Sequence, residues 1–197
     1  MVLRELTTNQ KGIVAETAIT WAAVKLGIGV ARPLDDEKYD LILDLGTILL
    51  RVQCKWAVRR GDVIAVRCRT SRRGPEGHIH RGYNPGEIDA IAAYCAANET
   101  CYLLPTVLSV NRAMVQLRLA PTRNNQRAGV HWASDYEFGA RLSDLGPIAQ
   151  LGERLHGMQE AGGSSPPGST SELRLFAWKG SGPRASAPGD RLPLTQS

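Results

Sequence analysis

Strict alternation of apolar and polar side chains over Leu49–Trp56 constrains the fold more than any other feature of this sequence. One face of the segment contains Leu50, Val52, Cys54 and Trp56, and the other contains Arg51, Gln53 and Lys55. This pattern is typical of a β-strand that lays one face on a core. Gln53 and Lys55 must then lie side by side on the opposite face, roughly 6.5–7 Å apart.

The residues just before this strand alternate in the same way. Tyr39, Leu41 and Leu43 point to one side, whereas Asp40, Ile42 and Asp44 point to the other. A turn at residues 45–47 would fold the two segments into a hairpin. We therefore expect Asp40 to lie beside Gln53 and Lys55.

Residues 8–26 predict a helix that precedes these strands. Thr7, Thr8 and Asn9 offer oxygens that can cap its first turn, and Gly27 is a plausible stop. Its apolar stripe consists of Ala15, Ala18, Ile19, Ala22 and Leu26. Glu16 lies at the flank of that stripe, with the small residues Gly12 and Ala23 on its face, so the helix can approach the sheet closely.

Further elements follow from the same periodicities. We expect strands at residues 29–33, 39–45, 48–57, 62–69, 101–104 and 114–119, a helix at 85–97, and a short helical piece at 131–138. Residues 71–83 read as a long exposed loop. This order predicts an α/β fold, with a mixed β-sheet core flanked by helices.

A carboxylate, an amide oxygen and an ammonium group at one place suit phosphodiester hydrolysis. Oxygen ligands hold Mg²⁺, which polarises the scissile phosphate and lowers the pKa of an attacking water. Lys55 would stabilise the developing negative charge or orient that water. Glu16, Asp40 and Gln53 are the candidate metal ligands. The alternative is an ordinary polar sheet face, with Glu16 pointing to water.

Three segments, KGIVAETA, RPLDDEKYDLILDL and RVQCKW, resemble the group I intron-associated PD-(D/E)XK homing endonucleases. That family has a helix Glu, an Asp at a strand start and a Q-x-K motif, which Glu16, Asp40, Gln53 and Lys55 match. The resemblance covers residues 6–138. It implies a restriction-endonuclease-like fold with the catalytic site on the sheet, Mg²⁺ as cofactor, double-stranded DNA as partner, and assembly into homo-oligomers (dimers or tetramers).

Arginine is concentrated beside the proposed site. The formal net charge is +5, which favours a polyanionic partner. The residues expected to contact DNA are Arg51, Arg59, Arg60, Arg67, Arg69, Arg72, Arg73, Arg123 and Arg127. Arginines near a hydrolytic site would neutralise phosphates and make DNA affinity dependent on salt. The alternative is a solvated basic face with no specific partner.

No apolar run is long enough to span a bilayer, and the first residues lack the apolar segment of a signal peptide. We therefore expect a cytoplasmic protein with no membrane partner. The four cysteines show no zinc-ligand spacing, and we expect them to be reduced packing residues.

The composition changes near residue 140. We expect a nuclease-like domain over residues 1–140 and a poorly ordered tail over 141–197, which is rich in Gly, Pro and Ser. Residues 146–170 permit a codon choice that folds on paper into the stems of a tRNA with a GGC anticodon. We hypothesise that the reading frame runs through a tRNA gene. The alternative is a short amphipathic helix followed by a linker.

These features together predict a Mg²⁺-dependent DNA endonuclease of the PD-(D/E)XK type, a phosphodiester hydrolase acting on duplex DNA. Two alternatives remain. One is a structure-specific nuclease of the junction type, which shares the fold and the metal site. The other is a catalytically degenerate DNA-binding module that keeps only the basic face.

Overall fold

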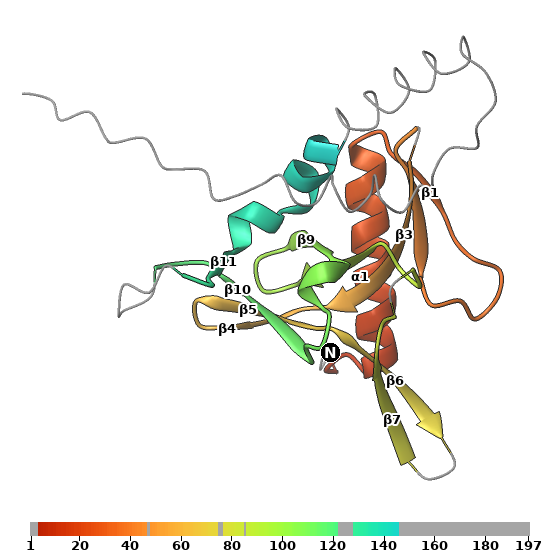
Figure 1. Ribbon diagram of the computed structural model, residues 1–197, viewed down its shortest axis with the longest axis horizontal. Helices are drawn as coiled ribbons and strands as arrows, with labels where there is room; N and C mark the ends of the chain where they lie inside the picture. Colours follow the sequence, from red (N-terminus) through yellow and green to blue (C-terminus); the bar gives the residue numbers. More distant parts are fainter. Residues whose placement is uncertain (1–3, 47, 75–76, 85, 122–127, 146–197) are drawn as a thin grey trace, which may run out of the picture. The chain divides into compact units, whose positions relative to one another are not determined.

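The computed structural model describes residues 4–46, 48–74, 77–84, 86–121 and 128–145 (Figure 1). All of them belong to one compact unit, Met1–Ser164. The second unit, Ser165–Ser197, lies wholly outside the described residues. The expected tail beyond residue 145 and the tRNA-gene hypothesis for 146–170 therefore also lie outside them and remain predictions.

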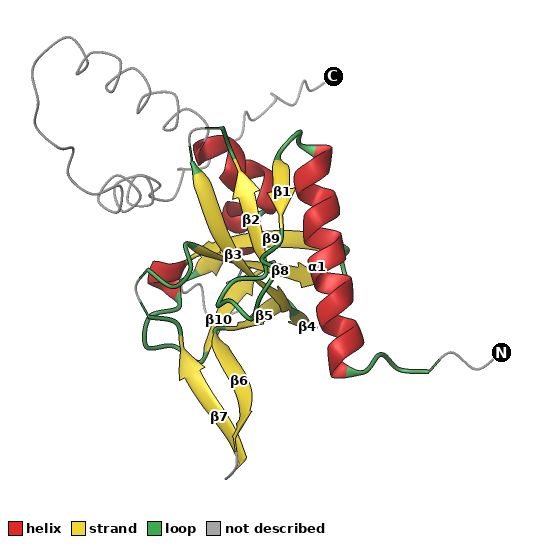
Figure 2. Cartoon of the chain, turned by 90° about the vertical axis from the view of Figure 1, so that its right-hand side faces the viewer, coloured by secondary structure: helices red, strands yellow, loops and turns green. Residues whose placement is uncertain are grey.

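A five-stranded sheet forms the centre of the fold and has the order β1-β2-β3-β8-β9. Its strands are β1 Gly29–Ala31, β2 Leu41–Asp44, β3 Leu49–Trp56, β8 Ala90–Cys95 and β9 Thr100–Pro105. β3 and β8 run parallel, whereas the other neighbours are antiparallel. The mixed sheet predicted from the sequence is confirmed (Figure 2).

The helix α1, Thr8–Lys25, confirms the first predicted helix and packs on one face of this sheet (Figure 2). Thr7 and Gln10 form a capping box at its start. At its end the backbone N–H of Gly27 donates to Val24 and that of Ile28 to Ala23, with Gly27 at a φ of 76°. Its fully buried residues are Ala15, Ile19 and Ala23. These small and branched side chains allow the close approach to the sheet that the sequence predicted.

A second sheet covers the opposite face of the first and has the order β11-β10-β5-β4. Its strands are β4 Val58–Arg60, β5 Val63–Arg67, β10 Met114–Arg118 and β11 His131–Trp132. The core between the two sheets includes Ile91, Ala93, Tyr102 and Leu104 from the first and Ile64, Val66, Val115 and Leu117 from the second. Two apolar cores, one on each face, therefore hold the five-stranded sheet.

The two remaining strands form a separate hairpin, β6 Arg69–Gly74 paired with β7 Gly77–Gly82. The prediction of an exposed loop over residues 71–83 is therefore wrong for most of this segment. Both views show the hairpin extending away from the two packed sheets (Figures 1 and 2). The predicted strand at 62–69 thus corresponds to β5, which ends at Arg67. The next strand, β6, begins at Arg69 and belongs to the separate hairpin.

The predicted helix at 85–97 is wrong, because that segment contains strand β8 at the centre of the first sheet. The predicted helical piece at 131–138 is confirmed over residues 133–136 and at residue 138, and it is wrong at residues 131–132. It consists of β11 and a short 3-10 helix, Ala133–Tyr136; another 3-10 turn, Thr106–Leu108, follows β9. Residues 138–145 are helical, and Leu142 and Leu145 are buried. The packed region thus continues past residue 140 to Leu145.

Cys54, Cys68 and Cys95 are buried and Cys101 is half-buried, and all four are free thiols. Cys54, Cys95 and Cys101 lie on strands of the first sheet and Cys68 lies between β5 and β6, so they are packing residues as the sequence predicted. In the part of the chain that the structure describes, no helix is both long and apolar enough to cross a membrane.

Candidate active site

The β2–β3 hairpin places Asp40 directly beside Gln53. Leu41 pairs with Val52 in the register of the two strands, and the backbone N–H of Asp40 donates to the Val52 carbonyl at 2.9 Å. Gly46, in the connecting turn, has a φ of 90°, a conformation that glycine adopts without strain. The hairpin predicted from the two alternating segments therefore forms, and it brings the acid and the amide together.

The Asp40 carboxylate is oriented by two hydrogen bonds that end on the same oxygen. Its Oδ2 accepts from the backbone N–H of Cys54 at 2.7 Å and from the Nε2 of Gln53. Asp40 Oδ1 and Gln53 Oε1 accept no hydrogen bond from any described residue. Two oxygen atoms of the kind that a hard cation takes as ligands thus remain available at this place.

Burial raises the pKa of the Asp40 carboxyl above its ordinary value, and the negative charge of Glu16 raises it further. Three groups lower the pKa of Asp40 without cancelling the effect of burial: the backbone N–H of Cys54, the charge of Lys55 and the side-chain amide of Gln53. The fold thus holds a carboxylate where its charge is only partly compensated. A bound cation would supply the missing compensation, and such a perturbed carboxyl is typical of a functional site.

Lys55 lies two residues further along β3, on the same face of the sheet as Gln53. Burial lowers the pKa of its ammonium group, and the charge of Asp40 opposes that shift. The Nζ atom lies 5.6 Å from the centre of the Tyr83 ring. Lys55 is therefore a half-buried cation close to Asp40 rather than a solvated surface lysine.

Glu16 approaches this group from α1 and forms an ion pair. Its Oε2 accepts a hydrogen bond from Nη1 of Arg32 at 3.0 Å. Burial raises the pKa of the Cys54 thiol as it does that of Asp40, and in both cases the charge of Glu16 adds to the effect. The structure therefore places Glu16 within electrostatic reach of Asp40, with Arg32 as its direct partner.

The oxygen donors at this place come from different kinds of side chain. Among the described residues, no three His, Cys, Asp or Glu side chains come close enough together to hold a metal ion. The candidate donors are instead the carboxylates of Glu16 and Asp40 and the amide oxygen of Gln53. An all-oxygen set suits Mg²⁺ or a similar hard divalent ion better than zinc. The residues present fit such an ion.

Most of the described arginines expected to contact DNA lie on two hairpins. Arg59, Arg60, Arg67 and Arg69 are exposed, on β4, at the end of β5 and at the start of β6. Arg72 and Arg73 belong to β6, whereas Arg123 and Arg127 lie outside the described residues. The structure thus distributes these cations along the β4–β5 and β6–β7 hairpins.

Arg51 pairs with Asp89, a contact that local sequence patterns do not reveal. Its Nε lies 3.1 Å from Oδ2 of Asp89, which also accepts from the Arg51 backbone N–H at 2.8 Å. The Asp89 N–H in turn donates to the Arg51 carbonyl at 2.8 Å. This exchange joins β3 to the residue before β8 and fixes the parallel register of the two strands. The sequence predicts a helix over residues 85–97, which would place Asp89 on a helix instead of beside Arg51.

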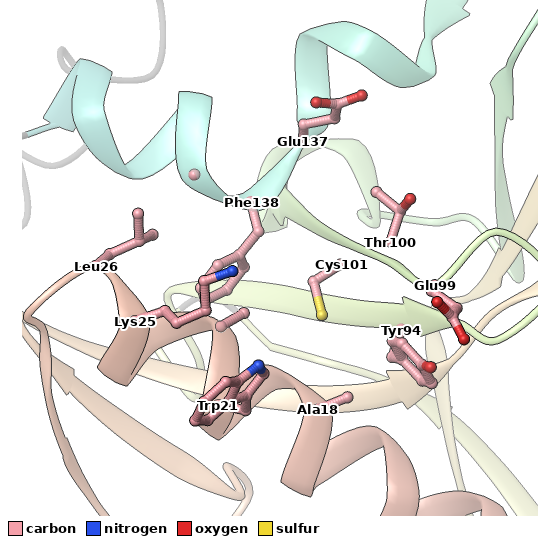
Figure 3. A pocket seen from close by; sticks show the side chains of 12 residues that line it. Ala18, Trp21, Lys25, Leu26, Tyr94, Glu99, Thr100, Cys101, Glu137 and Phe138 are labelled. Atoms are coloured by element: carbon pink, nitrogen blue, oxygen red, sulfur yellow. The ribbon is translucent and has the colours of Figure 1, made fainter.

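A pocket of about 510 Å³ lies elsewhere, between α1, the β8–β9 hairpin and residues 137–139 (Figure 3). Trp21 and Lys25 line it from the helix, Cys101 from β9, and Phe138 from the last helical segment. None of the four predicted site residues contributes to its lining. The pocket is therefore not the place where the acid, amide and ammonium groups meet.

Comparison with known proteins agrees with this geometry. A family model described as PD-(D/E)XK endonuclease matches residues 6–139. Among solved structures, that of a bacterial homing endonuclease, I-Ssp6803I, is similar, with a TM-score of 0.56 and 26% sequence identity. The similarity covers 77% of this chain and 99% of that one. No curated protein matches the chain significantly in sequence.

Proposed function

Because this chain belongs to the PD-(D/E)XK endonuclease family, we propose that it hydrolyses phosphodiester bonds of duplex DNA with Mg²⁺ as its metal ion. Nucleases of this family generally depend on a divalent metal. One observation supports the assignment most strongly. Asp40 and Gln53 share a hydrogen bond that leaves one oxygen of each available, beside the half-buried ammonium group of Lys55.

Each site residue has a distinct task in this proposal. Asp40 Oδ1, Gln53 Oε1 and the Glu16 carboxylate would hold the ion. When bound, the ion polarises the scissile phosphate and lowers the pKa of an attacking water. The Cys54 N–H keeps the Asp40 carboxylate in one orientation. Lys55 would donate to the phosphate as negative charge develops on it, in a site where burial strengthens that interaction.

The duplex would contact the two arginine-containing hairpins. A two-stranded ribbon such as β6–β7 has dimensions that the major groove of B-DNA accepts. Exposed arginines on β4 and β5 would neutralise further phosphates of the duplex. Arg51 is the exception, since Asp89 holds its guanidinium group.

The likeness to a bacterial homing endonuclease supports site-specific cleavage rather than degradation of any duplex. We also propose that the chain acts as a dimer or tetramer in the cytoplasm. Exposed apolar side chains on α1, among them Ile13, Trp21 and Val24, are available for contacts between copies. The mass measured by light scattering would decide the oligomeric state.

Cleavage of a randomised library of linear duplexes in Mg²⁺ tests the proposed function. We expect defined cut ends with the wild-type protein. Lys55→Ala and Asp40→Ala should each lower the rate by roughly 10²-fold or more, with DNA affinity retained. Lys25→Ala, which removes an exposed lysine of the pocket in Figure 3, is the matched control and should cleave normally.

Other outcomes identify the alternatives. A protein that binds DNA but leaves it intact in every divalent metal is a DNA-binding module, and the proposal is then wrong. Preferential cleavage of four-way junctions over linear duplexes indicates a junction nuclease. Equal rates for wild type and Lys55→Ala would remove Lys55 from the mechanism.

A further inference from the structure

Tyr83 is the aromatic residue next to the ammonium group of Lys55. It directly follows β7 and precedes β8, so it joins the projecting hairpin to the central sheet. Its side chain is half-buried and packs against the core between the two sheets. The centre of its ring lies 5.6 Å from Lys55 Nζ, within the range of a cation–π contact.

The hydroxyl group of Tyr83 does not hold the ring in place. The oxygen is buried and has no hydrogen-bond partner among the described residues. The neighbouring backbone is held instead, because the Asn84 N–H donates to Glu87 at 2.8 Å and Glu87 pairs with Arg81. Packing and this network therefore fix the ring, and a phenylalanine at position 83 would occupy the same place.

A lysine side chain has many rotamers, and ordering it for catalysis costs conformational entropy. The face of an aromatic ring attracts a cation most strongly where water is excluded. Both the charge of Asp40 and the Tyr83 ring attract the Lys55 ammonium group. The ammonium group is thereby restricted before any substrate arrives.

We propose that Tyr83 is a positioning residue of this nuclease, whose ring holds the Lys55 ammonium group at the cleavage site. The inference rests on the proposed function, in which Lys55 donates to the phosphate. Tyr83 itself touches neither DNA nor metal in this proposal; it acts through Lys55.

Single-turnover cleavage by Tyr83→Leu and Tyr83→Phe tests the role of the ring. Tyr83→Leu should lower the maximal rate about 3- to 30-fold, with the protein concentration for half-maximal rate and the Tm of the protein little changed. Tyr83→Phe keeps the ring and should restore most of that rate. In a Lys55→Ala background, Tyr83→Leu should cause no further decrease. An equal decrease in both backgrounds, an undiminished rate in Tyr83→Leu, or an equal decrease in Tyr83→Phe overturns the proposal.

NMR spectroscopy tests the contact independently of cleavage. Protons on the Lys55 ε-carbon should resonate upfield because of the ring current of Tyr83. The shift should persist in Tyr83→Phe and disappear in Tyr83→Leu, whose remaining spectrum reports whether the protein is folded. Absence of an upfield shift in the wild type overturns the inference even if the protein cleaves DNA. If the shift is present but DNA stays intact, the contact holds and the proposed function fails.

Discussion

Both hydrogen bonds to the Asp40 side chain end on Oδ2, and an asparagine can keep both with its single oxygen. Asp40→Asn would therefore remove a poorly compensated charge without breaking this network. We expect the Tm of the metal-free protein to rise by roughly 2–5 °C, because burial raises the pKa of Asp40 and disfavours its charged form. The same variant should lose cleavage. Thermal denaturation with and without Mg²⁺ checks both effects, since the metal should stabilise only the wild type.

The pH dependence of that stability difference has a definite sign. With its pKa raised by folding, Asp40 retains its proton in the folded state at pH values where the unfolded chain has released it. Protonated Asp40 thus stabilises the folded state. This contribution to the free energy of unfolding is fully present below the ordinary pKa of 3.8 and is lost as the pH rises through the raised pKa of the folded protein. The advantage of Asp40→Asn should thus shrink as pH falls towards about 4. A difference that grows on acidification would contradict the assignment.

Arg32 competes with a metal ion for the Glu16 carboxylate, because its guanidinium group lies 3.0 Å from one of the oxygens. The pair is partly exposed, so its contribution is modest. Arg32→Ala should raise Mg²⁺ affinity about 2- to 5-fold in isothermal titration calorimetry. Arg60→Ala, at an exposed position on β4, is the matched control. Unchanged or weaker affinity in Arg32→Ala would exclude Glu16 from the ligand set.

Strand β8 shows where sequence periodicity stops being informative. Ala90, Ala92 and Tyr94 face α1, and Ile91, Ala93 and Cys95 face the second sheet, so nearly every side chain is buried. A strand buried on both faces has no alternation, and its alanines favour a helix by intrinsic propensity. Packing between the two apolar cores, and not the helix propensity of alanine, makes residues 90–95 a strand. β2 and β3 alternate because only one face of each is fully buried, and the sequence predicts them correctly.

The β6–β7 hairpin allows a prediction on DNA binding. Replacing Arg72 and Arg73 with serine should weaken DNA affinity and reduce the slope of log K against log[salt] by about 1 for each phosphate that the protein no longer neutralises. Binding titrations at several salt concentrations measure both quantities, and metal affinity should stay constant. Lys25→Ser, on α1, serves as control. A slope equal to that of the wild type would mean that the ribbon does not touch phosphates.

Across the whole chain, the candidate site residues of the β2–β3 hairpin were easier to predict from the sequence than the residues that contact them from other elements. Asp40, Gln53 and Lys55 follow from alternation and one turn, since the period of a strand fixes which side chains share a face. The pairing of Glu16 with Arg32 depends on how α1 approaches the sheet, which local pattern does not specify. Tyr83 follows a hairpin that sequence periodicity does not reveal. Its closeness to Lys55 is a tertiary contact.

The residues after Leu145 should be dispensable if they derive from a tRNA gene. A chain that ends at Leu145 keeps the buried Leu142 and Leu145 and should retain the Tm within about 2 °C, since all described core residues are kept. Its cleavage rate should equal that of the full chain. A large decrease in the Tm or in the cleavage rate would mean that the residues after Leu145 contribute to stability or to activity. The nucleotide sequence of the gene tests the origin itself, because the stems must be present over codons 146–170.

Anomalous diffraction from crystals grown with Mn²⁺ tests most directly whether one helix and two strands together hold a single divalent ion. We predict one peak within about 2.5 Å of Asp40 Oδ1, Gln53 Oε1 and a Glu16 oxygen, with Lys55 Nζ facing the open side of the ion. A peak elsewhere, or no peak around an ordered Asp40–Gln53 pair, would contradict this assignment of the metal site.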